Sequence, residues 1–242
     1  MADRRRHRGP HPADAELFAD SRHRVLQQAV ADLSWLFGRG YVLPSALKLV
    51  GDRYQLTERQ RNAVMRAACS EAARQQRARR RVSAAALRQA RVDIDGFNLL
   101  TTIEAALSGG VLLRCRDGAM RDMASMHGTY RTVEETEPAL RLIGKALQRL
   151  QSGPVCWWLD RPVSNAGRLA SQIRELAEQE GWPWSAELHR NPDQQLMELT
   201  DSVIDSADRV VIEGSSAWYP LANLIVDEDI REAWIIELRD IA

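Results

Sequence analysis

Apolar residues recur every three or four positions through the first third of the chain, which is the spacing of one buried helix face. Over residues 13–40 they are Leu17, Val25, Leu26, Ala29, Val30, Leu33 and Leu36. Gly38 and Gly40 predict the end of this amphipathic helix, and Pro44 predicts the start of another. The pattern therefore indicates helices that pack through one face.

A further long helix is predicted over residues 56–81, with Thr57 as its N-cap. Its late part is rich in arginine: Arg74, Arg77, Arg79, Arg80 and Arg81. These side chains form either an ordinary solvated helix face or a surface for nucleic acid or another anionic partner. We expect an all-helical domain over residues 13–90, preceded by a basic, flexible N-terminus over residues 1–12.

The pattern changes after residue 90 to short apolar runs that alternate with helical periodicity. The predicted strands are 91–95, 111–118, 154–160, 184–189 and 208–214, and the predicted helices are 98–110, 137–153, 165–181, 193–207 and 227–238, with a helical turn in 121–130. Strands that alternate with helices are typical of a parallel sheet covered on both faces. We therefore predict an α/β protein whose residues 91–242 form a three-layer, Rossmann-like parallel sheet.

Charge divides the chain in the same place. The net charge of the 242 residues is zero, but residues 1–92 hold 19 Lys and Arg against 8 Asp and Glu, a net charge of +11. Residues 93–242 hold 14 against 25, a net charge of −11. Either the basic part faces a polyanion, or the two parts attract each other.

Several classes of protein are excluded by what the sequence lacks. No run of 18 apolar residues is present, so no membrane-spanning helix is expected. The basic N-terminus has no apolar stretch typical of a signal peptide, so we expect a cytoplasmic protein. Cys69, Cys115 and Cys156 are far apart and odd in number, which predicts neither a zinc site nor a disulfide framework.

Acidic residues follow several of the predicted strands. Asp95, Asp117 and Asp160 end strands, and Asp193 opens the helix after another. Carboxyl ends of parallel strands meet at one edge of a sheet, where ligands bind. Converging carboxylates suit Mg²⁺ or Mn²⁺, and two such ions can activate water for phosphodiester cleavage.

We predict Asp95, Asp160 and Asp193 as the metal ligands and catalytic residues. The predicted supporting residues are Asn98, Asp117, Asp122, Ser164 and Ser215. Simpler roles stay open: Asp95 in a turn with Gly96, Asp160 in a loop ion pair, and Asp193 as a helix N-cap. The segment around Ser164 could likewise bind a phosphate through backbone N–H groups or merely cap a helix.

Five long segments of the chain have distinctive sequences: "RGPHPADAELF", "RGYVLPSALKLVGDRYQLTERQRNAVMR", "IDGFNLLTTIEAALSGG", "RDGAMRDMASMHGTY" and "LDRPVSNAGRLA". Through these segments the chain resembles an uncharacterised prokaryotic family, domain of unknown function 434 with its companion domain of unknown function 5616. The resemblance spans nearly the whole chain but implies no activity.

The second part of the chain also resembles PIN and NYN ribonuclease domains. Those domains open with D-G-x-N after a strand, as in residues 95–98, and place a later acid at a helix start, as Asp193 does. They also have a strand followed by T/S-x-D, and after the predicted strand 208–214 this chain has Ser215 and Ser216 instead. The resemblance implies a metal-dependent ribonuclease that acts on RNA, degenerate at Ser215. The alternative is a non-catalytic module that binds nucleic acid or protein.

A third resemblance concerns the segment "DIDGFN", which is similar to the D-x-D-G-T opening of haloacid-dehalogenase phosphatases. It implies Asp93 as nucleophile and Asp95 as general acid. Phe97 stands in place of the expected Thr, so we place this alternative below the nuclease.

Overall fold

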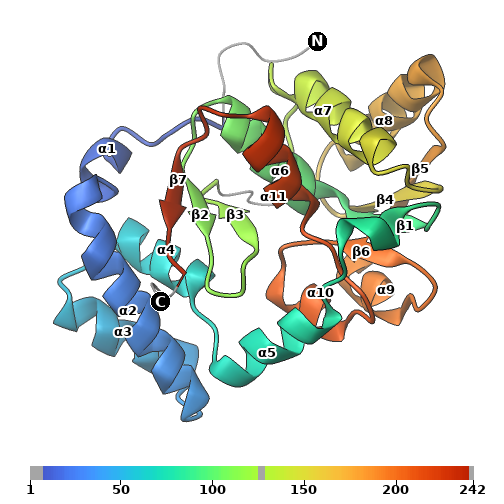
Figure 1. Ribbon diagram of the computed structural model, residues 1–242. Helices are drawn as coiled ribbons and strands as arrows, with labels where there is room; N and C mark the ends of the chain where they lie inside the picture. Colours follow the sequence, from blue (N-terminus) through green and yellow to red (C-terminus); the bar gives the residue numbers. More distant parts are fainter. Residues whose placement is uncertain (1–7, 125–128, 240–242) are drawn as a thin grey trace.

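The computed structural model describes residues 8–124 and 129–239, and its first part is all-helical (Figure 1). The helices are α1 Asp14–Leu17, α2 Asp20–Gly38, α3 Leu43–Arg53, α4 Glu58–Ala67 and α5 Glu71–Arg80, followed by the 3-10 turn η1 Ala84–Leu87. Thr57 caps α4 through a reciprocal capping box with Gln60, as predicted for this N-cap. The single helix predicted over residues 56–81 is wrong, because the chain is extended at Ala68 and Ser70 caps a separate α5.

A four-stranded parallel sheet forms the centre of the second part. Its strands are β1 Val92–Asp95, β4 Val155–Asp160, β5 Trp184–His189 and β6 Val203–Asp205, in the order β5-β4-β1-β6. The chain builds outward from β1 to β5 and then returns to place β6 on the other side of β1. This reversal is the topological switch point of a doubly wound sheet, where ligands bind in α/β proteins.

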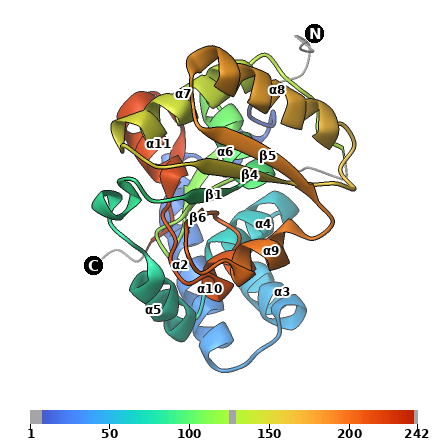
Figure 2. The same cartoon turned by 90° about the vertical axis from the view of Figure 1, so that its right-hand side faces the viewer.

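Helices cover both faces of this sheet (Figure 2). The helices α6 Gly96–Leu107, α7 Thr136–Arg149, α8 Ala166–Glu180 and α11 Leu221–Asp229 lie on one face, and α9 Pro192–Glu198 and α10 Arg209–Gly214 lie on the other. The main apolar core lies under the first group, where Ile94 and Trp157 are fully buried in register with each other. The predicted three-layer α/β fold is confirmed.

A second, smaller sheet joins the two parts of the chain. It consists of the hairpin β2 Leu112–Arg114 and β3 Met120–Asp122, with β7 Ile235–Glu237 parallel to β2. Leu113 and Ile236 from this sheet are buried in one apolar cluster with Leu33 and Val64 of the helices. The helical part therefore completes its core with strands from beyond residue 90.

Three predicted elements near the C-terminus are wrong. Residues 193–207 divide into α9 and β6, and residues 208–214 form the helix α10 instead of a strand. The side chain of Asp208 accepts hydrogen bonds from the N–H groups of Val210 and Val211, which starts α10. The predicted helix 227–238 ends at Asp229 and is followed by β7.

The remaining sequence predictions concern the segment 121–130, the N-terminus, the cysteines and membrane-spanning helices. Of the helical turn predicted over 121–130, the first two residues belong to β3, and residues 125–128 lie outside the described residues. In the predicted flexible N-terminus, Arg8 donates a hydrogen bond to Glu104 at 2.5 Å and lies over the Tyr130 ring. The three cysteines are buried and unbridged. No helix in residues 8–124 and 129–239 has the length and apolar character that a membrane crossing requires.

Candidate functional site

Four aspartates gather beyond the carboxyl ends of the parallel strands. Asp95 ends β1, Asp160 ends β4, Asp193 lies in the first turn of α9 after β5, and Asp208 follows β6 at the start of α10. The charges of Asp193, Asp208 and Asp160 all raise the pKa of Asp95. The structure therefore brings the three predicted ligands into one electrostatic group and adds Asp208 to them.

Asp95 is the most perturbed member of this carboxylate group. It is 7% exposed, and its burial raises its pKa to about 8, against the lowering effect of a hydrogen bond from Ser206. Burial also raises the pKa values of Asp160 and Asp193, and for Asp193 the charges of Asp208 and Asp160 add to the effect. Asp95 is therefore mostly protonated at neutral pH without a bound cation.

The turn Ser206–Asp208 is held in place by the residues around it. Ser206 Oγ donates to Asp95 Oδ2 at 2.8 Å and accepts from the N–H of Asp208 at 2.9 Å. The N–H of Ala207 donates to Asn98 Oδ1 at 3.0 Å. Asn98, predicted as a supporting residue, thus holds the turn that places Asp208.

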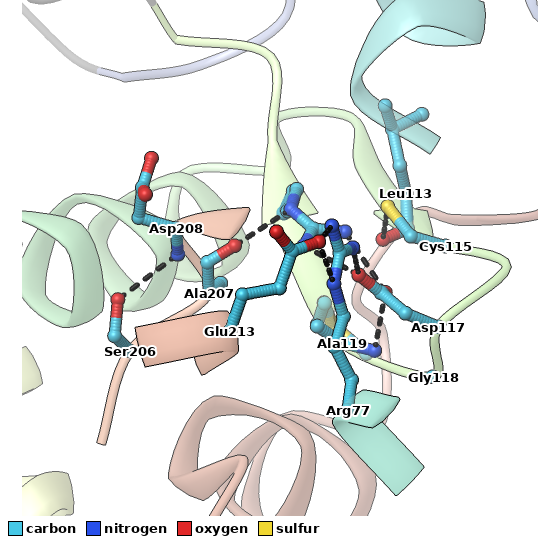
Figure 3. A network of polar contacts seen from close by, with 12 residues as sticks. Arg77, Leu113, Cys115, Asp117, Gly118, Ala119, Ser206, Ala207, Asp208 and Glu213 are labelled. Carbon is cyan, nitrogen blue, oxygen red and sulfur yellow. Dashed lines mark hydrogen bonds and ion pairs between the residues drawn. The ribbon is translucent and has the colours of Figure 1, made fainter. Parts of the chain in front are cut away.

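Ala207 is also held from its other side, by a buried ion-pair network (Figure 3). Arg121 Nε donates to the carbonyl oxygen of Ala207 at 2.8 Å, and its two Nη atoms donate to the carboxylate of Asp117 at 2.9 and 2.7 Å. Arg77 of α5 pairs with the same carboxylate and with Glu213 of α10. We call Arg77, Asp117, Arg121 and Glu213 the arginine network.

The arginine network changes two of the predicted roles. Asp117 lies in the β2–β3 turn and serves as the counterion of two guanidinium groups. Burial alone would raise the pKa of its carboxyl, but the charges of Arg121 and Arg77 hold it at about 2. The prediction that Arg77 faces solvent or nucleic acid is wrong, because its side chain is 3% exposed and fully paired.

The other arginines of α5 differ in their surroundings. Arg74 pairs with Glu71, whereas Arg79 is exposed. Arg81 is exposed and lies over the Trp218 ring at 5.9 Å, and Arg80 is partly buried. The charge available at this helix is therefore smaller than the sequence suggests.

The remaining predicted site residues, Ser215, Ser164 and Asp122, do not belong to the group of four carboxylates. Ser215 is fully buried after α10, and its Oγ donates to the carbonyl oxygen of Ile212 at 3.5 Å. The strand that placed it at the site does not exist. Ser164 is exposed, and its carbonyl oxygen accepts from Tyr130. Asp122 accepts from Thr102 at 2.9 Å and lines the same cleft as Asn98.

The sequence prediction missed Ser206 and Asp208 because β6 was hidden inside a predicted helix. The segment after β6 is Ser206-Ala207-Asp208, which is itself a T/S-x-D sequence. The short run "VID" directly before it, with the β-branched residues Val203 and Ile204, was the signal that could have revealed it.

The alternative that makes Asp93 a nucleophile has little support in this geometry. Both carboxylate oxygens of Asp93 accept from Arg91 at 2.8 Å, and one also accepts from Trp158 Nε1. Its side chain is fully buried. A carboxylate held in this way is not free to attack a substrate.

Hard oxygen donors are what this site offers to a ligand. Within the described residues, no group of three or more His, Cys, Asp or Glu side chains is already arranged as a metal site. Among contacts to residues 8–124 and 129–239, Asp208 accepts hydrogen bonds at Oδ1 as the helix cap and Asp95 accepts one at Oδ2 from Ser206, which leaves the second oxygen of each carboxylate for a ligand. Within the described part of the chain, none of the four aspartates forms an ion pair with a Lys or Arg side chain.

A doubly wound parallel sheet with aspartates at its switch point defines the α/β fold class of this protein. Comparison with known protein families defines the family to which it belongs. The chain belongs to the family described as Domain of unknown function (DUF5616), whose model matches residues 84–224. Residues 25–80 match the model described as Protein of unknown function (DUF434). Both matches confirm the resemblance found in the sequence.

A relative of similar length supports this assignment. The uncharacterized protein MJ0935 of Methanocaldococcus jannaschii is 27% identical over 202 residues, which cover 84% of this chain and 95% of the relative. No solved structure matches the chain. The resemblance to PIN and NYN domains stays a prediction.

Proposed function

We propose that this protein is a divalent-metal-dependent nuclease that acts on RNA, with Asp95, Asp160, Asp193 and Asp208 as the residues that hold Mg²⁺ or Mn²⁺. The observation that supports it most is the raised pKa of Asp95, caused by burial and by three neighbouring carboxylates. A bound cation would offset this repulsion.

The residues present fit such an ion. Four carboxylates supply the oxygen donors that Mg²⁺ and Mn²⁺ prefer, and Asp208 Oδ2 and Asp95 Oδ1 are available for it. Asp95 must lose its proton, and the carboxylates must rotate toward one another, as the ion enters. The ion would supply charge stabilisation and an activated water for phosphodiester cleavage.

The chain's own residues would perform the remaining tasks. Ser206 and Asn98 orient the site, since they fix Asp95 and the Ser206–Asp208 turn respectively. The T/S-x-D sequence at residues 206–208 follows β6 and supplies the acid that the PIN-like resemblance leads us to expect after a strand, which supports an intact site over one degenerate at Ser215. RNA as substrate rests on that resemblance and on the basic excess of residues 1–92.

Replacement of Asp208 by Asn is the direct test of this function. We expect wild-type protein to bind Mn²⁺ in isothermal titration and to cleave labelled single-stranded RNA. Asp208→Asn should weaken Mn²⁺ binding at least tenfold and abolish cleavage, because the amide removes one negative charge from the ligand set. The matched control is Asp201→Asn, an exposed aspartate on the loop before β6, which should leave both unchanged.

The outcomes separate the candidate functions. Mn²⁺ binding without RNA cleavage by the wild type would contradict the nuclease and favour a non-catalytic nucleic-acid-binding module. Equal Mn²⁺ affinity in wild type and Asp208→Asn would show that the four carboxylates are not the metal site.

A further inference from the structure

A cleft of about 180 Å³ opens beside Asp208, one of the four carboxylates. Its walls come from four separate segments, namely α4, α6, the β2–β3 hairpin and the start of α10. The lining residues are Arg66, Asn98, Thr102, Arg121, Asp122, Ala207, Asp208 and Arg209. Asp208 is thus shared between the cleft and the carboxylate group, so a ligand in the cleft lies next to the proposed cation.

Three of the lining residues are arginines, and two of them are fixed in place. Arg66 donates from Nη1 to the carbonyl oxygen of Asp122 at 2.5 Å and from Nη2 to that of Ala124 at 3.2 Å. Its side chain stays 32% exposed. Arg121 is held by Asp117 and the Ala207 carbonyl. Fixed guanidinium groups bind an anion without losing much conformational entropy.

Arg209 is the cation in the cleft that is left for a ligand. In the described part of the chain its side chain forms no hydrogen bond or ion pair, and it is only partly exposed. Asp122 accepts from Thr102 Oγ1 and from the N–H of Ala124, and Arg66 Nη1 lies 3.8 Å from its Oδ1, which offsets its charge. Asp208 is the other acid of the cleft, and a cation bound there would neutralise it.

We propose that this cleft binds one backbone phosphodiester group of a single-stranded nucleic acid through the side chains of Arg209 and Arg66. This phosphate neighbours, along the strand, the phosphate that would be cleaved at the four carboxylates. The proposal rests on the proposed function for the identity of the strand. A guanidinium group matches the geometry of a phosphate through paired N–H donors. Because Asp208 forms part of the wall, affinity for the phosphate should rise when Mn²⁺ is present.

The test compares Arg209→Gln with two matched variants. Binding of fluorescein-labelled single-stranded RNA is followed by anisotropy, once in EDTA and once in Mn²⁺, with strand integrity checked on a gel. Arg209→Gln should weaken binding about tenfold and reduce the slope of log Kd against log salt concentration by about 0.7, as expected for one lost phosphate contact to a single strand. Arg209→Lys should recover part of the affinity. Arg231→Gln, an exposed arginine outside the cleft, should match the wild type.

Failure of this proposal differs from failure of the proposed function. If Arg209→Gln and Arg231→Gln bind RNA equally while Mn²⁺ binding persists, the cleft is not a phosphate site but the metal site stands. If no Mn²⁺ binds and Arg209→Gln still weakens RNA binding in EDTA, the cleft stands and the nuclease fails. Inorganic phosphate that competes as strongly per phosphate group as the strand would overturn the assignment to nucleic acid.

Discussion

Asp117→Asn should lower the free energy of unfolding by about 3–5 kcal/mol, because it leaves two buried guanidinium groups without their shared counterion. Asp117 is 1% exposed at its side chain and pairs with both Arg77 and Arg121. An amide in its place would bring its N–H₂ donors against cationic donors. Urea denaturation followed by circular dichroism measures the difference.

The control for this prediction is an exposed ion pair on α5, the helix that carries Arg77. Glu71 pairs with Arg74, and both side chains are more than 40% exposed, so Glu71→Gln should change the free energy of unfolding by less than about 1 kcal/mol. A loss below about 1 kcal/mol for Asp117→Asn would mean that the arginine network contributes specificity but little stability.

The same network predicts an acid sensitivity. The folded-state pKa of Asp117 is about 2, below the ordinary aspartate value of 3.8, so the pair contributes stability above about pH 4. That contribution is lost as the pH falls toward 2, because the folded state resists protonation that the unfolded state accepts. The wild type should therefore lose stability in this range faster than Asp117→Asn.

The fold class could be predicted from the sequence because its signals are local and repeated. The alternation of "VDID", "VCWWLD" and "WSAELH" with amphipathic segments of ten or more residues indicates a parallel sheet covered on both faces. Each of these strands lies where the sequence pattern placed it. Elements of this kind need no knowledge of their tertiary neighbours.

The region after residue 190 could not be predicted in the same way. β6 is three residues long, and its apolar residues continue the helical spacing of α9 by chance. The run "RVVIEG" has the β-branched residues of a strand, but the Asp208 cap and burial of Val211 and Ile212 favour a helix. Tertiary packing decides between helix and strand in runs this short.

The candidate site shows the consequence of that error. Asp95, Asp160 and Asp193 follow strands that were placed correctly, so their grouping follows from the rule for parallel sheets. Asp208 could not be found, because its strand was assigned to a helix. The burial of Arg77 was also hidden, since its partners Asp117 and Glu213 are 40 and 136 residues away in sequence.

Asp95→Asn should stabilise the metal-free protein at alkaline pH while it removes the gain in stability from Mn²⁺. The folded-state pKa of Asp95 is about 8, above the ordinary value of 3.8. Between these values the folded state keeps a proton that the unfolded state has released, so wild-type stability falls as the pH rises from about 4 to 8. Asparagine is neutral throughout, and can still accept the hydrogen bond from Ser206.

The measurement is urea unfolding of both proteins in EDTA at pH 5, 6.5 and 8.5. The advantage of Asp95→Asn over the wild type should be smallest at pH 5 and should grow by up to about 4 kcal/mol at pH 8.5. Asp205, whose burial raises its pKa to about 7, is present in both proteins, so its titration cancels in the difference. In Mn²⁺ at pH 8.5 the order should reverse, because only the wild type is stabilised by a bound ion. A difference that does not change with pH would show that the Asp95 carboxyl is not protonated in the folded state, and the electrostatic argument for a cation at these four carboxylates would then fail.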